Sequence, residues 1–287
     1  MQPHRLDFRD HRRSLRDNRY VYAVVSRRAR GLSIGINLNP DKVCNFDCPY
    51  CQVDRTVPGG PRDVDLAVLE AELDELLARV EDGSLWEEAP FDTAAPEMRV
   101  VRDVAIAGDG EPTSCTVFAE AVEVIGRVRG AHGLDDVALT LLTNATLFHR
   151  PRVEAGLARF AALGGVVWAK LDAGTQGYFE EVDGTRLPLR RVLDNIVVEG
   201  RKQALVLQCL FMTLDGEGPD DHELDAWQER LREIGDAGAQ ISLVQVYSIA
   251  RRPAEARVGV LPLERLEEIG DRARALGLET VVVPGVG

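Results

Sequence analysis

Apolar runs alternate with amphipathic segments along most of this 287-residue chain, and this alternation is the feature that most restricts its fold. Continuous apolar strands that alternate with helices indicate a parallel sheet with right-handed crossovers. We therefore predict an α/β fold, a partial (β/α)6 barrel of the TIM type whose ligands lie at the carboxyl ends of the strands. The predicted strands are 20–25, 32–38, 100–107, 137–143, 166–171, 204–212, 241–247 and a short last strand, 279–283. The predicted helices are 65–80, 117–128, 151–163, 187–199, 220–234 and 262–276.

Charge is spread unevenly along the chain. Residues 1–30 contain nine arginines and three aspartates, a net charge of +6. The whole chain has a net charge of −13, so residues 31–287 carry −19. We accordingly predict a basic N-terminal extension, 1–30, and one α/β domain, 31–287. An acidic body repels phosphate. The basic extension therefore either binds a phosphate or an RNA backbone, or packs its arginines on the acidic body.

Composition and cysteine use predict the compartment. No apolar run is long enough to cross a bilayer, and residues 1–20 place arginines and aspartates where a signal peptide needs an apolar stretch. The chain has five cysteines, three of them within eight residues, which suits metal binding in a reducing compartment better than a disulfide framework. We expect a cytoplasmic protein with no membrane partner.

The three clustered cysteines are Cys44, Cys48 and Cys51, which follow an apolar strand on a loop and can converge on one metal centre. A structural zinc site and an ordinary ferredoxin cluster both need four ligands, and three thiolates leave one corner open. A [4Fe-4S] cluster held by three thiolates keeps one iron free, to which S-adenosylmethionine (SAM) can offer an amine and a carboxylate. A zinc loop or a set of unpaired thiols is the alternative.

This cysteine spacing, with Tyr50 directly before the last cysteine, resembles the signature of the radical SAM superfamily. A predicted strand also ends in a glycine-rich turn, where a backbone can approach a ligand closely. In the resemblance this turn matches the Gly-Gly-Glu motif that binds the SAM amine, with Asp109 in place of the second glycine. The resemblance further implies that Tyr50 lies under the adenine. The turn residues are Gly108, Asp109, Gly110, Glu111 and Pro112.

Other polar residues stand at the ends of predicted strands, beside the expected cavity. Asn144, Lys170 and Asp172 are candidates for cofactor binding: Lys170 could neutralise the SAM carboxylate, and Asp172 could take a ribose hydroxyl or a substrate group. A buried salt bridge between Lys170 and Asp172, which share a strand face, is the alternative. Cys115 lies beyond the turn and is a candidate hydrogen-atom donor, whereas Cys209 fits a small buried hydrophobe.

The likeness narrows to the radical SAM family related to wyosine-type tRNA base synthases. It extends over Gly31-Leu32-Ser33-Ile34-Gly35-Ile36-Asn37-Leu38, Leu142-Thr143-Asn144, Lys170-Leu171-Asp172-Ala173-Gly174 and Val244-Gln245-Val246-Tyr247. The synthases carry a second cluster on further cysteines, and here only Cys115 and Cys209 remain. The resemblance therefore implies a SAM-cleaving enzyme with a flavodoxin or ferredoxin electron donor and a small-molecule substrate. The alternatives are a tRNA-modifying enzyme, a glycyl-radical activase and a non-catalytic metal-binding redox module.

Overall fold

The computed structural model describes residues 18–26, 31–251 and 253–285. These residues divide into two compact units. The first comprises residues up to Val43 together with Pro58–Leu141 and Pro151–Val166; the second comprises Cys44–Val57, Leu142–Arg150 and Val167 onward. Most of the predicted basic extension, residues 1–17 and 27–30, lies outside the described residues.

The first unit contains a mixed sheet in the order β1-β2-β3-β4. Strand β1 pairs antiparallel with β2, and the pairs β2-β3 and β3-β4 are parallel. The apolar residues of β2, Leu32, Ile34 and Ile36, are fully buried, which explains their strict alternation in the sequence. The strands are β1 (Val21–Ser26), β2 (Gly31–Ile36), β3 (Val101–Ile106) and β4 (Ala138–Thr143); the division between the units falls inside β4.

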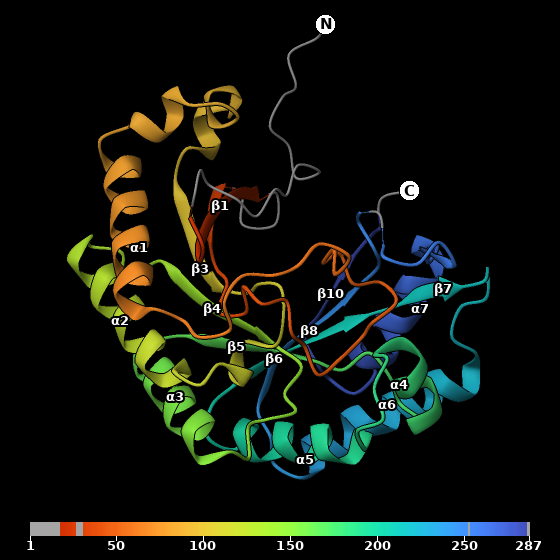
Figure 1. Ribbon diagram of the computed structural model, residues 1–287. Coiled ribbons are helices and arrows are strands. Elements are labelled where there is room, and N and C mark those ends of the chain that lie inside the picture. The colour runs from red at the N-terminus through yellow and green to blue at the C-terminus, as the bar shows by residue number, and fades with distance from the viewer. Residues whose placement is uncertain (1–17, 27–30, 252, 286–287) are drawn as a thin grey trace, which may run out of the picture. The chain divides into compact units, whose positions relative to one another are not determined.

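Three helices pack beside one another in the first unit, as Figure 1 shows for α1, α2 and α3. Helix α1 begins at an N-cap, Asp65, whose carboxylate accepts from two backbone N–H groups of the first turn. Four short 3-10 helices occupy the polar connection before β3 and the turn after it. The bounds are α1 (Leu66–Glu81), η1 (Ser84–Glu87), η2 (Phe91–Thr93), η3 (Pro96–Met98), η4 (Pro112–Ser114), α2 (Phe118–Ala131) and α3 (Pro151–Ala162).

The second unit contains four parallel strands in the order β5-β6-β8-β10. A separate antiparallel pair, β7 with β9, was not predicted from the sequence. The strands are β5 (Val166–Lys170), β6 (Leu205–Leu210), β7 (Met212–Leu214), β8 (Ile241–Tyr247), β9 (Val258–Val260) and β10 (Thr280–Val283). The helices are α4 (Gln176–Val182), α5 (Leu189–Gly200), α6 (Asp221–Asp236) and α7 (Leu263–Arg274).

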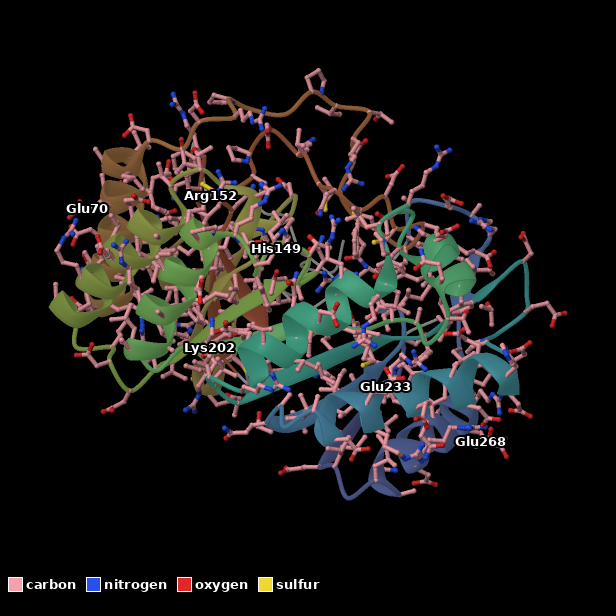
Figure 2. All side chains as sticks on the ribbon, turned by 90° about the horizontal axis from the view of Figure 1, so that it is seen from below. Glu70, His149, Arg152, Lys202, Glu233 and Glu268 are labelled. Atoms are coloured by element: carbon pink, nitrogen blue, oxygen red, sulfur yellow. The ribbon has the colours of Figure 1, made fainter. Side chains whose placement is uncertain are left out.

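Charged side chains of α5, α6 and α7 pair with one another on the surface of the second unit, where Glu233 and Glu268 are labelled in Figure 2. Glu233 accepts from Arg190 of α5 at 3.2 Å and from Arg230 at 3.0 Å. Exposed pairs of this kind contribute at most about 1 kcal/mol each. These ion pairs therefore keep the helix surfaces polar and add little to the stability of the fold. None of the helices in the described part of the chain is long and apolar enough to cross a membrane.

Candidate cofactor site

The three clustered cysteines lie on an irregular segment of the second unit that forms neither helix nor strand. Cys44, Cys48 and Cys51 are all half-buried. The only regular feature is a turn in which the Cys51 N–H donates to the Cys48 carbonyl at 2.9 Å. Because no helix or strand fixes the loop, its shape must come from contacts with other segments.

The largest set of such contacts comes from the turn after α4, a segment that sequence reasoning missed. The Asp47 N–H donates to the Asp183 carbonyl at 3.1 Å, and the Thr185 hydroxyl donates to the Asn45 carbonyl at 3.4 Å. Between them Gly184 has φ +58, and a Cβ there would lie 2.1 Å from the Asp47 carbonyl oxygen. The Asp183-Gly184 dipeptide, a common turn signal, was the sequence feature that could have revealed this turn.

An aromatic contact extends the same support. Phe46 of the cysteine loop meets Phe179 of α4 edge to face, with ring centroids 5.5 Å apart. Both rings are buried, and such pairs contribute about 0.5 to 1.5 kcal/mol beyond their area. Helix α4 therefore packs against the cysteine loop and supports it.

Asn144 contacts the cysteine loop through Asn45. The Asn144 amide donates to Asn45 Oδ1 at 2.7 Å, and the Asn45 amide donates to Thr146 Oγ1, also at 2.7 Å. The Thr146 hydroxyl in turn donates to Asn144 Oδ1. Asn144 thus holds the loop in place, a role we had not predicted, and its assignment to cofactor binding stays a prediction.

The carboxyl-terminal half of the loop is held by main-chain bonds. The Ala254 N–H donates to the Cys51 carbonyl at 3.0 Å, and the Glu255 N–H donates to the Pro49 carbonyl at 3.1 Å. Segments after β5, β4 and β8 therefore fix the loop along its length.

A buried group of charges lies against Cys48. The Lys170 ammonium is 3.1 Å from Asp172, 3.5 Å from Asp183 and 3.8 Å from Cys48 Sγ. It also donates a hydrogen bond to Tyr50 Oη, and the Tyr50 hydroxyl donates to Asp172. The side chains of both aspartates are almost fully buried. This is the buried salt bridge given above as the alternative for Lys170 and Asp172, and their roles in cofactor binding stay predictions. The structure adds Asp183, which sequence reasoning missed.

Burial and the neighbouring charges together set the acid–base properties of this group. It raises the pKa of the Cys48 thiol well above its ordinary value, against the opposing effect of the Lys170 charge. Burial opposes the charge on Lys170, but Asp172, Cys48 and Asp183 together raise the pKa of the ammonium. Burial, together with the neighbouring Asp172, raises the pKa of Asp183. Lys170 therefore remains charged, and a metal bound by Cys48 would replace the thiol proton.

Strand register places Lys170 beside two other polar side chains of the sheet. Lys170 at the end of β5 pairs with Gln208 of β6, which pairs with Gln245 of β8. Residues in register on parallel strands point to the same face, so the three polar side chains form a row. Gln208 donates to Gln245 Oε1 at 3.0 Å, and the Asp172 carboxylate accepts the Leu210 N–H at 2.8 Å.

The glycine-rich turn belongs to the first unit. The Asn37 side chain accepts the Asp109 N–H at 3.1 Å and donates to the Asp109 carboxylate at 2.8 Å. A Cβ at Gly108 would lie 2.1 Å from Asn37 Oδ1, and one at Gly110 would lie 2.2 Å from the Val43 carbonyl oxygen. Both positions therefore require glycine, as close packing of the turn predicts.

Glu111 is almost fully buried at the end of this turn. Its carboxylate accepts from the Thr113 N–H at 3.1 Å and from the Thr113 hydroxyl at 2.6 Å, so it caps the short helix η4, which begins at Pro112. Cys115 follows η4, and burial raises the pKa of its thiol. The hydrogen-atom donor role of Cys115 stays a prediction.

One buried acceptor beside the turn has no partner among the described residues. Asn39 donates from its amide to Ser114 Oγ at 3.0 Å, but its Oδ1 atom makes no hydrogen bond. An unsatisfied buried acceptor is costly and suits a donor supplied by a ligand. The tight glycines, the Glu111 carboxylate and this acceptor fit a ligand that carries an ammonium group, as SAM does.

The cysteine loop is the candidate position for a metal centre. Within 18–26, 31–251 and 253–285, no three His, Cys, Asp or Glu side chains are grouped closely enough to hold one metal ion. A four-iron cluster binds each of its thiolate ligands to a different iron, so the three sulfur atoms need not meet at one point.

Comparisons with known proteins define the class of fold. No family model matches the chain. A curated relative, a UPF0026 protein of Helicobacter pylori strain J99, is 23% identical over 235 residues, which cover 81% of this chain and 68% of the relative. An archaeal relative, UPF0026 protein MJ1312 of Methanocaldococcus jannaschii, is 26% identical over 204 residues, 67% of this chain and 54% of its own length.

Solved structures give the fold. Streptococcus suis SuiB bound to S-adenosylmethionine superposes with a TM-score of 0.58 at 13% identity over 87% of this chain, which spans only 50% of SuiB. TYW1 with a bound lysine–pyruvate adduct gives a TM-score of 0.50 at 13% identity, covering 86% of this chain and 74% of TYW1. This chain therefore has the fold of SuiB and TYW1, and the predicted α/β partial-barrel class is confirmed.

Proposed function

We propose that this protein is a radical SAM enzyme in which Cys44, Cys48 and Cys51 hold a [4Fe-4S] cluster. The observation that carries the proposal is a three-cysteine loop, fixed by three separate segments of a protein with the radical SAM fold. When bound, the cluster would supply the electron that cleaves SAM to methionine and a 5′-deoxyadenosyl radical, and this radical would abstract a hydrogen atom from a substrate. An electron donor of the flavodoxin or ferredoxin class would reduce the cluster.

The chain's own residues then have distinct tasks. Helix α4 and the Asp183–Thr185 turn hold the thiols in position, and the tight turn at Gly108 and Gly110 admits a ligand to the backbone. Glu111 offers a carboxylate to the SAM amine, and Tyr50 lies under the adenine. Gln208 and Gln245, in register on β6 and β8, would present polar groups to a small-molecule substrate.

Anaerobic reconstitution tests this function. The wild type should bind about four irons per chain, with a broad charge-transfer absorbance, and should release 5′-deoxyadenosine from SAM and dithionite even without substrate. Cys48→Ala should abolish both properties. Cys209→Ala is the matched control, because this thiol is buried in β6, outside the cysteine loop, and the variant should retain both properties. An intact cubane in Cys48→Ala would refute the ligand assignment, and a reducible cluster that yields no 5′-deoxyadenosine would favour a redox module.

A tRNA substrate is the second candidate, favoured by the likeness to TYW1. The acidic charge outside residues 1–30 and the shortage of further cysteines oppose it. The basic extension decides between the two candidates, because phosphate contacts make binding steeply dependent on salt. Tight, salt-sensitive tRNA binding that disappears when residues 1–19 are removed would place this candidate first; we expect no loss of RNA affinity on truncation.

A further inference from the structure

Lys170 is placed to do more than neutralise buried carboxylates. Its ammonium lies 3.8 Å from Cys48 Sγ, within range of a hydrogen bond to sulfur. Two rings of the cysteine loop also face it, with the ammonium 4.6 Å from the centroid of Tyr50 and 5.9 Å from that of Phe46. A cation over an aromatic face is attracted to the ring. Lys170 therefore belongs to the surroundings of the cysteine loop, although it comes from β5.

The ammonium is held rigidly in this position. Asp172 and Asp183 approach it at 3.1 and 3.5 Å, and it donates to the Tyr50 hydroxyl. Its side chain is only 19% exposed, so the surrounding water screens its charge weakly. A fixed, poorly screened charge acts more strongly on a neighbouring metal centre than a mobile surface charge does.

A positive charge hydrogen-bonded to a ligand sulfur stabilises the reduced form of an iron–sulfur cluster, because reduction adds negative charge there. Hydrogen bonds to sulfur, net charge and solvent exposure are the levers that set cluster potentials. We propose that Lys170 is a positioning residue that raises the reduction potential of the cluster through its contact with Cys48. The inference rests on the proposed function, since it requires a cluster on Cys48. It differs from the predicted role of Lys170 as a partner of the SAM carboxylate.

A redox titration of the reconstituted protein without SAM tests the inference. Lys170→Met should bind iron at the wild-type level and show a more negative midpoint potential, followed by the electron paramagnetic resonance signal of the reduced cluster. Lys170→Arg keeps the charge and should return the potential toward the wild-type value. Lys202→Met is the matched control, because Lys202 is an exposed lysine beyond α5 (Figure 2) and should leave the potential unchanged.

A second variant guards against failure to fold, since Lys170→Met leaves two buried aspartates without their cation. Lys170→Met/Asp172→Asn removes both members of the ion pair, an exchange that proteins tolerate better than the loss of one partner. It should shift the potential in the same direction by a smaller amount, because the loss of the Asp172 negative charge partly offsets the loss of the Lys170 positive charge. An unchanged midpoint potential in both variants at full iron content would overturn the inference while leaving the proposed function intact. Wild-type protein that binds no iron would overturn the proposed function, and this inference with it.

Discussion

Gly184→Ala should damage the cysteine loop from a position that carries no metal ligand. Gly184 has φ +58, a conformation that costs a residue with a Cβ about 1 to 2 kcal/mol. The added Cβ would also lie 2.1 Å from the Asp47 carbonyl oxygen, so the loop must move away. Movement strains the bond from the Asp47 N–H to the Asp183 carbonyl, worth about 1 kcal/mol. The combined loss is about 2 to 3 kcal/mol.

Thermal denaturation and iron content measure this effect. A loss of that size lowers the melting temperature by roughly 2 to 4 °C per kcal/mol, so we expect a decrease of roughly 4 to 12 °C in the metal-free protein. Iron bound after reconstitution should fall as well, because the thiols are displaced. Gly177→Ala is the matched control: it lies in α4, a Cβ there meets nothing within 4 Å, and alanine favours the helix. Wild-type melting and full iron binding in Gly184→Ala would refute the reasoning.

Two further predictions concern the first unit. Glu111→Gln should leave iron content unchanged and lower SAM affinity about tenfold to a hundredfold, because a charge-assisted hydrogen bond to the amine contributes about 1.5 to 3 kcal/mol. Isothermal titration calorimetry with SAM measures this change in affinity. His132 lies between Asp74 and Glu81 of α1 at 3.0 and 2.9 Å. Burial opposes its charge, but these hydrogen bonds raise its pKa above the ordinary 6.5. Its contribution to stability is therefore complete below pH 6.5 and is lost as pH rises through the raised pKa.

Each of these two predictions has its own control. For Glu111, the exposed Glu120→Gln in α2 should change neither iron nor SAM binding, and loss of iron in Glu111→Gln would make that residue structural. For His132, the free energy of unfolding in urea should differ between the wild type and His132→Gln by less than about 1 kcal/mol, because the carboxylates of Asp74 and Glu81 are exposed. A difference that grows with pH would contradict the assignment.

The sequence alone determined the strands other than β7 and β9, most helices and the cysteine loop. Alternating runs such as Leu32, Ile34 and Ile36 mark a strand because side chains on one face of a sheet share burial. Cysteine spacing identified the loop because ligand chemistry is local: three thiols within eight residues serve few other purposes. The glycine-rich turn was also identifiable from the sequence, because glycines mark places where the chain packs too closely for a side chain, and a Cβ at Gly108 or Gly110 would clash.

Tertiary structure decided what surrounds these residues. Nothing near Cys48 in sequence indicates that Asp183 lies 3.6 Å from its sulfur, or that Lys170 hydrogen-bonds to Tyr50. Such contacts depend on strand register and on the path of the chain after each strand, which are set by packing over the whole unit. Helix α4 escaped prediction because its seven residues carry too short an apolar pattern to reveal a helical period. The sequence thus specified the residues that could bind a cluster, and packing specified which charged side chains lie beside them.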